Sequence, residues 1–282
     1  MVVSQAEKAQ RFESLHRRPG TFVIPNPWDA GTARILEGLG FEALTTTSAG
    51  LALTLGRSDG SRSVTREEAL ANARAIVEAT SIPVAADLEN GYGDSPEAAA
   101  ETIRLAGAAG LVGGSIEDAS GDPGRPIYDF RHAVERVAAA AEAAHALPFP
   151  FMLVARAEGL FRGRNDLDDT IRRLQAFEAA GADVLFAPGL ATAEQIRAVC
   201  AAVTRPVNVI MGLAGAPFTV ADLAAMGVKR ISVGSALSRA ALGAFVRAAR
   251  EVREQGTFRF AADAIPFADA NALAAGRRPP AA

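Results

Sequence analysis

Short apolar runs rich in branched side chains occur eight times along the chain, separated by alanine-rich stretches with helical spacing. Their separation of roughly 25–35 residues suits one strand–helix unit of a parallel architecture. The runs span residues 21–25, 43–47, 83–87, 111–117, 151–156, 184–187, 207–210 and 230–234. Glycine-containing turns precede several runs and longer loops follow them, the two longest expected at residues 48–62 and 119–128. This arrangement predicts an α/β fold, a (β/α)8 TIM barrel. A doubly wound nucleotide-binding sheet is disfavoured because no G-x-G-x-x-G follows the first run.

The last part of the chain predicts a helical extension to this barrel. We expect one barrel domain over residues 1–258, then a C-terminal extension and tail over residues 259–282. After Gly234 a long helix is expected to run to about Gln255, with alanines repeated along one face. Beyond it lie Phe258, Phe260 and Phe267, and exposed apolar groups of this kind usually mark an interface.

Composition limits the classes of partner. Of the 282 residues, 49% are hydrophobic, enough for a large core, and the net charge of −3 is spread without basic blocks. This excludes nucleic acid and anionic membrane surfaces as expected partners and favours small molecules. No apolar run approaches the roughly 18 residues needed to span a bilayer, so we expect a cytoplasmic protein. Cys200 is the single cysteine and is expected to be a buried structural thiol in a helix.

Charged residues follow three successive apolar runs at the point where each run ends. Asp87 and Glu89 follow the third run, Glu117 ends the fourth, and Arg156 with Glu158 ends the fifth. The carboxyl ends of the strands of a parallel barrel meet on one face, where active sites are built. The sequence therefore predicts an active site made of these acids and Arg156.

The residue inventory excludes several chemistries. The two lysines, Lys8 and Lys229, lie before the barrel and just before the eighth run, so a Schiff-base lysine at the carboxyl-end face is not expected. The three histidines lie before the barrel or in the helix after the fourth run, which disfavours zinc and Ser-His-Asp sites. Carboxylates, hydroxyls, Arg156 and Asn208 remain. Clustered carboxylates call for a cation, and oxygen ligands suit Mg²⁺, or Mn²⁺, with several bound waters.

Each charged residue also has a structural interpretation. Asp87 and Glu117 could cap the helices that follow, although two acids at adjacent strand ends favour function. Glu89 precedes an Asn-Gly pair, and turns of this kind favour polar residues whether or not they have a function. Arg156 could serve only to pair with the acids, because an unpaired guanidinium there would be costly.

Two other segments are open to two interpretations. Thr47, Ser48, Ala49 and Gly50 offer hydroxyls and amides at the end of the second run, and could hold an oxyanion or simply turn the chain. Trp28, after the first run, could face the substrate or plug the barrel mouth.

These residues, in this order, resemble the isocitrate lyase/phosphoenolpyruvate mutase superfamily over residues 11–258. The family signature D-x-D-x-G-[YF]-G occurs here as D-L-E-N-G-Y-G at residues 87–93, with glutamate as the second acid. The I-E-D pattern occurs at residues 116–118, and the arginine strand ends in A-R-A-E at residues 155–158. Residues 55–59 resemble the family's outer acid loop, and residues 47–50 fall where it binds a substrate carboxylate or phosphonate.

The resemblance implies a ligand set. Asp87 would reach Mg²⁺ directly or through water, while Asp59, Glu89 and Glu117 would hold metal-bound waters. It also implies a homo-oligomer built on dimers, a dimer of dimers in which neighbours exchange the C-terminal helix.

The loop after the fourth run departs from the family pattern. Isocitrate lyases carry K-x-C-G-H there, whereas residues 119–126 of this chain contain no cysteine, lysine or histidine. The mutases carry a histidine after the sixth strand, where this chain has Ala187-Pro188-Gly189. Glycines and prolines make residues 119–128 a candidate gating lid.

The resulting hypothesis is an Mg²⁺-dependent lyase that breaks a C–C bond in a small 2-oxo or 2-hydroxy dicarboxylate, by retro-aldol cleavage or decarboxylation through an enolate. Arg156, Glu158 and Asn208 would be catalytic or orienting groups, and residues 47–50 would hold the substrate carboxylate. A phosphonate mutase or hydrolase is the enzymatic alternative. A barrel that binds 2-oxo acids without turnover is the non-enzymatic one.

Overall fold

The structure, a computed structural model, describes residues 3–60, 63–213 and 218–277. Within them, eight parallel strands form one sheet in the order β1-β8-β7-β6-β5-β4-β3-β2. The strands are β1 (Phe22–Ile24), β2 (Leu44–Thr45), β3 (Val84–Asp87), β4 (Gly113–Glu117), β5 (Met152–Arg156), β6 (Val184–Phe186), β7 (Val207–Ile210) and β8 (Arg230–Ser232).

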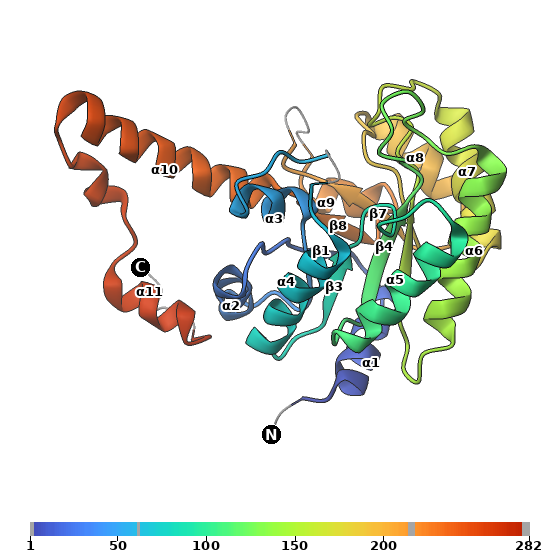
Figure 1. The fold of residues 1–282 in the computed structure, drawn as a ribbon, viewed down its shortest axis with the longest axis horizontal. Helices are drawn as coiled ribbons and strands as arrows, with labels where there is room; N and C mark the ends of the chain where they lie inside the picture. Colours follow the sequence, from blue (N-terminus) through green and yellow to red (C-terminus); the bar gives the residue numbers. More distant parts are fainter. Residues whose placement is uncertain (1–2, 61–62, 214–217, 278–282) are drawn as a thin grey trace.

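The gap between β1 and β2 is bridged by hydrogen bonds from the ends of the strands. The amide of Thr45 donates to the carbonyl of Pro25 at 3.1 Å, and the side chain of Asn26 donates to the carbonyl of Thr46 at 2.8 Å. The sheet is thereby a nearly closed barrel, and the predicted (β/α)8 fold is confirmed (Figure 1).

Helices surround the barrel and close one end of it. In the described residues they are α1 (Gln5–Arg17), α2 (Ala30–Gly38), α3 (Ser48–Thr54), α4 (Arg66–Ala79), α5 (Pro96–Ala108), α6 (Phe130–His145), α7 (Leu167–Ala179), α8 (Ala193–Ala202), α9 (Val220–Ala225), α10 (Ala236–Gln255) and α11 (Phe267–Ala274). The spacing Thr65-x-x-Glu68 predicts a capping box, and the box forms at the start of α4. The pair Ser95-Pro96 predicts a helix start, and Ser95 caps α5 with Pro96 in its first turn.

The segment expected to be a long loop, residues 48–62, begins instead as helix α3. Thr47 is its N-cap and accepts a hydrogen bond from the amide of Gly50 at 3.3 Å. Leu51 and Ala52 are buried in a small apolar cluster with Val64. The loop prediction was wrong for these residues because a capping threonine and a buried apolar pair outweigh the glycine. Its last two residues, 61 and 62, lie outside the described part of the chain.

The core has two parts, one inside the barrel and one between the strands and the outer helices. The inner cluster includes Phe12 of α1, Val154 and Phe186. Gly113 is required there, because a Cβ at this position would lie 2.8 Å from the ring of Phe12. Helix α1 therefore seals the amino end of the barrel with an aromatic side chain, and leaves the carboxyl ends of the strands for the polar residues.

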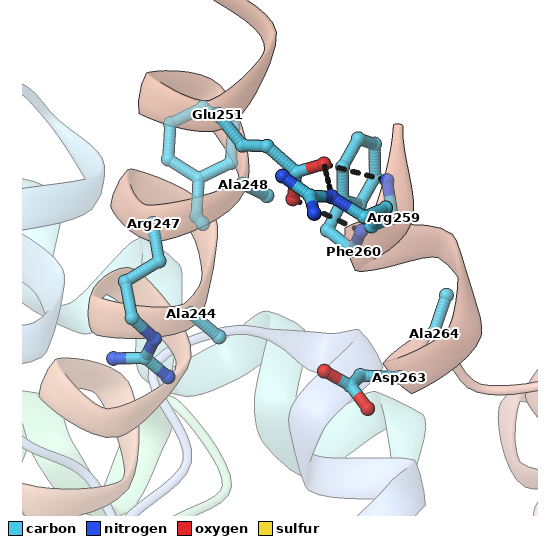
Figure 2. Close-up of a pocket in the computed structure, with 9 residues that line it drawn as sticks. Ala244, Arg247, Ala248, Glu251, Arg259, Phe260, Asp263 and Ala264 are labelled. Atoms are coloured by element: carbon cyan, nitrogen blue, oxygen red, sulfur yellow. Dashed lines mark hydrogen bonds and ion pairs between the residues drawn. The ribbon is translucent and has the colours of Figure 1, made fainter. Parts of the chain in front are cut away.

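Helix α10 and the described residues that follow it, 236–277, form an arm that projects from the barrel (Figure 1). Of its 20 residues, Ser238 is the one that the structure describes as buried. A short 3₁₀ helix, η1 (Arg259–Asp263), folds back against it because the carboxylate of Glu251 accepts hydrogen bonds from the amides of Arg259 and Phe260 at 2.6 and 3.1 Å (Figure 2). Helix α11 then returns to α2, where Arg34 donates to the carbonyl of Ala274 at 3.1 Å.

The arm encloses a groove and exposes apolar side chains. The groove between α10 and η1 has a volume of about 460 Å³ and lies between Ala244, Ala248 and Asp263 (Figure 2). Phe245 is 68% exposed and Phe267 is 90% exposed. The predicted boundary at residue 258 falls within this arm and stays a prediction, as does the tail, whose residues 278–282 lie outside the described part. None of the described helices is long and apolar enough to cross a membrane.

Candidate active site

Arg156, the last residue of β5, gathers the acids of three neighbouring strand ends. Its guanidinium lies 2.8 Å from Asp87 Oδ1, 3.0 Å from Glu117 Oε2 and 2.7 Å from Glu158 Oε1. The side chain is 14% exposed, and the ring of Phe186 lies beneath it at 5.3 Å. The carboxyl ends of β3, β4 and β5 thus bring together the residues that the sequence places after separate apolar runs.

Asp87 is oriented from two sides. Its Oδ1 faces Arg156, while its Oδ2 accepts hydrogen bonds from the hydroxyl and the amide of Ser48 at 2.8 and 3.3 Å. Ser48 is the first residue of α3, where helix dipole and free amides favour a negative charge. The segment expected to hold an oxyanion therefore holds the carboxylate of Asp87 in this structure.

The other residues of that segment serve the start of α3. Ala49 lies in the first turn of the helix, and Gly50 donates its amide to Thr47. A Cβ on Gly50 would lie 2.6 Å from Thr47 Cγ2 and 3.0 Å from Trp28 Cβ, so the close packing requires glycine.

The turn after β3 is strained. Among the non-glycine residues that the structure describes, Glu89 and Tyr92 are the two with positive φ angles, of 47° and 57°. Such backbone costs about 1–3 kcal/mol per residue and is often found at functional sites. Here the strain is compatible with directing the Glu89 carboxylate toward Asp87 and Asp59, whose charges act on it.

Negative charge exceeds positive charge in this cluster. In the described residues the carboxylates of Asp59, Asp87, Glu89, Glu117 and Glu158 face the guanidinium groups of Arg156 and Arg162. Burial, then the charges of Asp87 and Asp59, raises the pKa of Glu89 to about 7. Burial raises the pKa of Glu117 well above its usual range, although the charge of Arg156 opposes this. Burial followed by the charge of Asp87 also raises the pKa of Asp59.

This excess charge fits a hard divalent cation. Among the described residues, no three acidic, histidine or cysteine side chains converge as a ready-made metal cage, because Arg156 lies between Asp87 and Glu117. Mg²⁺ keeps several waters and needs one or two direct carboxylates, so such convergence is not required. The oxygen-only donors and their uncompensated charge therefore suit Mg²⁺ or Mn²⁺, and the expected ligands, Asp87 with Asp59, Glu89 and Glu117, stay a prediction.

Glu158 is fully buried and depends on a second layer of contacts. Its amide donates to Asp118 Oδ1 at 2.7 Å, and Asp118 Oδ2 accepts a hydrogen bond from Arg173 at 3.2 Å. Its Oε2 atom has no hydrogen-bond partner among the described residues. Asp118 belongs to the I-E-D pattern, but its supporting role was not predicted, since it requires knowledge of which helix packs behind β4.

Arg162 was also missed in the sequence. It lies on the turn after β5, 3.7 Å from Glu117 and 3.8 Å from Glu158. The signal available in the sequence was a second arginine six residues after Arg156 in a glycine-containing turn, which does not reveal on which side of the turn it lies.

Asn208 and Trp28 make no described contact with the acids and arginines of the charged cluster. Asn208 is buried inside the barrel and donates to the hydroxyl of Ser232 at 3.0 Å. Trp28 lines an apolar pocket of about 220 Å³ with Leu53 of α3 and Leu242 of α10. No contact described by the structure joins either residue to Arg156, so their predicted roles in the site stay predictions.

The candidate lid is a compact hairpin in this structure. Ala119 pairs with Ile127 in an antiparallel bridge, and the amide of Ser120 donates to the carbonyl of Pro126 at 3.0 Å. Tyr128 closes its base, with its hydroxyl donating to Asp94 at 2.5 Å. The tip, residues 121–125, is exposed, and gating stays a prediction.

The family model described as phosphoenolpyruvate phosphomutase matches residues 12–253. The chain belongs to this family. The resemblance to the isocitrate lyase/phosphoenolpyruvate mutase superfamily is thereby confirmed, and its members are carbon–carbon lyases and mutases.

Relatives and solved structures agree with this assignment. The chain is 32% identical over 212 residues to an oxaloacetate decarboxylase of Bradyrhizobium sp. strain BTAi1, covering 73% of this chain and 70% of that one. It is 31% identical over 185 residues to the 2,3-dimethylmalate lyase of Eubacterium barkeri, covering 63% and 62%. A solved structure from Burkholderia cenocepacia J2315, described as a candidate lyase/mutase, matches with a TM-score of 0.92 and 58% identity over 95% of each chain.

Proposed function

We propose that this protein is an Mg²⁺-dependent lyase that cleaves a C–C bond in a small 2-oxo or 2-hydroxy dicarboxylate. The observation that carries this proposal is the buried Arg156, held within 3.0 Å of three carboxylates that outnumber the nearby cations. Such a site can accept a divalent cation and a substrate anion side by side. The named activities of the oxaloacetate decarboxylase and dimethylmalate lyase relatives support the same substrate class.

Some residues of the site orient the acids, and Arg156 supplies positive charge. Mg²⁺, when bound, would act as a Lewis acid toward the 2-oxo or 2-hydroxy carboxylate end of the substrate. Ser48 fixes the carboxylate of Asp87, and Asp118 fixes the backbone at Glu158. Arg156 directs its guanidinium to where negative charge develops on the substrate oxygens, in a site that is largely removed from water.

A phosphonate mutase or hydrolase is the second candidate, because the matching family model carries the phosphomutase description. The same arginine, together with a cation held by the carboxylates, would stabilise a transferring phosphoryl group. A third possibility is a barrel that binds 2-oxo acids without turnover.

One experiment separates the three functions. The protein with Mg²⁺ is incubated with 2,3-dimethylmalate, oxaloacetate or phosphonopyruvate, and products are identified by NMR. Cleavage of a diacid supports the lyase, rearrangement or hydrolysis of the phosphonate supports the alternative, and binding without products supports the third. The Arg156→Met variant and protein-free buffer with the same Mg²⁺ are the controls, since free metal ions also promote loss of CO₂ from oxaloacetate.

We also propose that a second copy of the chain covers the arm in a homo-oligomer built on dimers. Phe245 and Phe267 are exposed by 68% and 90%, a large apolar surface for a chain in water. Light scattering at micromolar concentration is expected to give a multiple of the monomer mass, and truncation after Arg250 is expected to reduce it. A monomer before truncation would contradict the assembly, whereas an unchanged mass after truncation would contradict the role of the arm.

A further inference from the structure

Arg162 holds a second guanidinium at the edge of the charged cluster. Its Nη2 atom lies 3.7 Å from Glu117 Oε1, and its Nε atom lies 3.8 Å from Glu158 Oε2. Glu117 and Glu158 are also the partners of Arg156. The two guanidinium groups therefore flank the same pair of carboxylates.

The two arginines differ in how fully their donors are used. Arg156 is 14% exposed and contacts its acids at 2.7 to 3.0 Å. Arg162 is 36% exposed, its ion-pair distances exceed hydrogen-bond length, and its guanidinium makes no hydrogen bond within the described part of the chain. Its outer face packs loosely against Phe161, whose ring centre is 6.0 Å away. Arg162 thus has donors available for an anion that enters the site.

The turn that carries Arg162 is held in place. The amide of Arg162 donates to the carbonyl of Glu158 at 2.9 Å, and the amide of Arg164 donates to the carbonyl of Gly159 at 2.9 Å. Gly189, with φ of +95°, packs against the turn so closely that a Cβ would lie 2.9 Å from the amide nitrogen of Phe161. A donor fork on a fixed turn suits recognition of a planar carboxylate.

We propose that Arg162 binds the second carboxylate of a dicarboxylate substrate and thereby favours retro-aldol cleavage over decarboxylation. This inference rests on the proposed lyase function. The carboxylate at the other end of the substrate would lie toward Arg156, which flanks the same two acids as Arg162.

The preference follows from where charge moves in each reaction. In retro-aldol cleavage of a 2-hydroxy diacid, the bond between carbons 2 and 3 breaks and its electron pair spreads from carbon 3 into the second carboxylate. The hydroxyl proton passes to a carboxylate of the site, carbon 2 becomes a carbonyl carbon, and carbon 3 takes a proton from water. Negative charge on the second carboxylate rises, so a guanidinium there lowers the barrier.

Decarboxylation has the opposite requirement. The second carboxylate leaves as CO₂ and loses its charge as the bond breaks. A guanidinium bound to it stabilises the ground state more than the transition state and slows the step.

A binding experiment tests the contact directly. Dissociation constants for malate and for its C4 monoamide are measured by calorimetry with Mg²⁺ present. The wild-type protein is expected to prefer malate by roughly 30-fold, and Arg162→Gln to reduce this preference below about threefold, because the charge-assisted hydrogen bonds are lost. Arg162→Lys should restore part of it. Arg164→Gln, on the same turn with no side-chain hydrogen bond or ion pair described for it, is the matched control and should keep the wild-type ratio.

A purely structural role for Arg162 would weaken both ligands alike and leave the ratio unchanged, which would overturn the inference. The rates give a second readout. Arg162→Gln should reduce kcat/KM for cleavage of 2,3-dimethylmalate by roughly 100-fold, while decarboxylation of oxaloacetate falls by less than about tenfold. Equal losses in both reactions would overturn the proposed reaction preference.

The two proposals fail in different ways. If the wild-type protein cleaves none of the diacids yet loses its preference for malate on Arg162→Gln, the lyase function fails and the carboxylate contact stands. If the wild-type protein cleaves a diacid and Arg162→Gln cleaves it equally fast, the lyase function stands and the inference about Arg162 fails.

Discussion

Two buried arginines lie at opposite ends of this barrel, and their surroundings differ in kind. Arg156, at the carboxyl end of β5, lies within 3.0 Å of three carboxylates. Arg230, the first residue of β8, is 4% exposed, and its Nε and Nη1 atoms have no hydrogen-bond partner in the described part of the chain. It faces the ring of Phe12 at 6.0 Å and adds positive charge beside His16.

The pKa of each guanidinium moves in the direction its neighbours dictate. Burial alone would lower the pKa of Arg156, but Glu117, Glu158 and Asp87 raise it well above its ordinary value. Burial lowers the pKa of Arg230 to about 9. The carboxyl end of the barrel is thus organised by charge, and the amino end by packing under α1. This difference predicts that equivalent substitutions have opposite consequences at the two ends.

The largest expected effect on the function is the loss of metal binding. Asp87→Asn keeps an acceptor for Ser48 but removes the charge, so affinity for Mg²⁺ should fall by about 100-fold or more while the fold is retained. Calorimetry measures the affinity and circular dichroism the fold. Asp168→Asn, an exposed acid at the start of α7, is the control and should bind as the wild type does. Unchanged Mg²⁺ affinity in Asp87→Asn would remove Asp87 from the metal assignment.

Replacing each arginine by methionine tests the comparison itself. Arg156→Met leaves Glu117 and Glu158 buried without their nearest cation and should lower the free energy of unfolding by about 3–5 kcal/mol. Arg230→Met replaces an unpartnered buried charge by an apolar chain and should leave this free energy unchanged or raise it by about 1 kcal/mol. Urea unfolding at pH 7 measures both free energies. Equal losses in the two variants would show that both arginines stabilise the fold in the same way.

Stability should also fall with acid through His16, a buried residue of α1. Burial, with the charges of Arg230 and Lys229, lowers the pKa of His16 from 6.5 to about 3, although the carbonyl of Phe12 opposes this. The unfolded chain therefore binds the proton more tightly, so the contribution is complete above pH 6.5 and is lost as the pH falls toward 3. Between pH 7 and 5 the loss should be about 2 kcal/mol.

Urea unfolding of the wild type and of His16→Gln at the two pH values isolates this loss, because acids with a raised pKa, such as Glu89, shift the stability the other way in both proteins. His16→Gln should remove most of it, whereas His145→Gln, an exposed histidine of α6, should retain it. A loss between pH 7 and 5 that is as large in His16→Gln as in the wild type would show that His16 does not carry it.

The smallest expected effect comes from Cys200, near the end of α8 beside the turn at Gly227. Burial raises the pKa of its thiol to about 11, so no thiolate is available at neutral pH. Cys200→Ser should keep turnover within about twofold of the wild type. Inactivation by this change or by a thiol reagent would show that the amino end of the barrel does contribute to the chemistry.

The fold could be predicted because it depends on periodicity. Each apolar run is long enough to be buried on both faces, and the glycine turns and the capping residues Thr65 and Ser95 mark where helices begin and end. Helix α3 was not predicted, because its seven residues contain glycine and threonine and form only when Leu51 and Ala52 have neighbours to pack against.

Within the site, the chain order by itself determined that Asp87, Glu117 and Arg156 share one face, since parallel strands in a barrel end on the same side. Only the tertiary structure decided how they are used. Ser48 binds Asp87 because α3 begins at that strand end, Arg162 joins the cluster because Gly189 seats its turn, and Asn208 points into the barrel toward Ser232. These contacts join segments far apart in sequence, and no local period records which side chain a distant loop will meet.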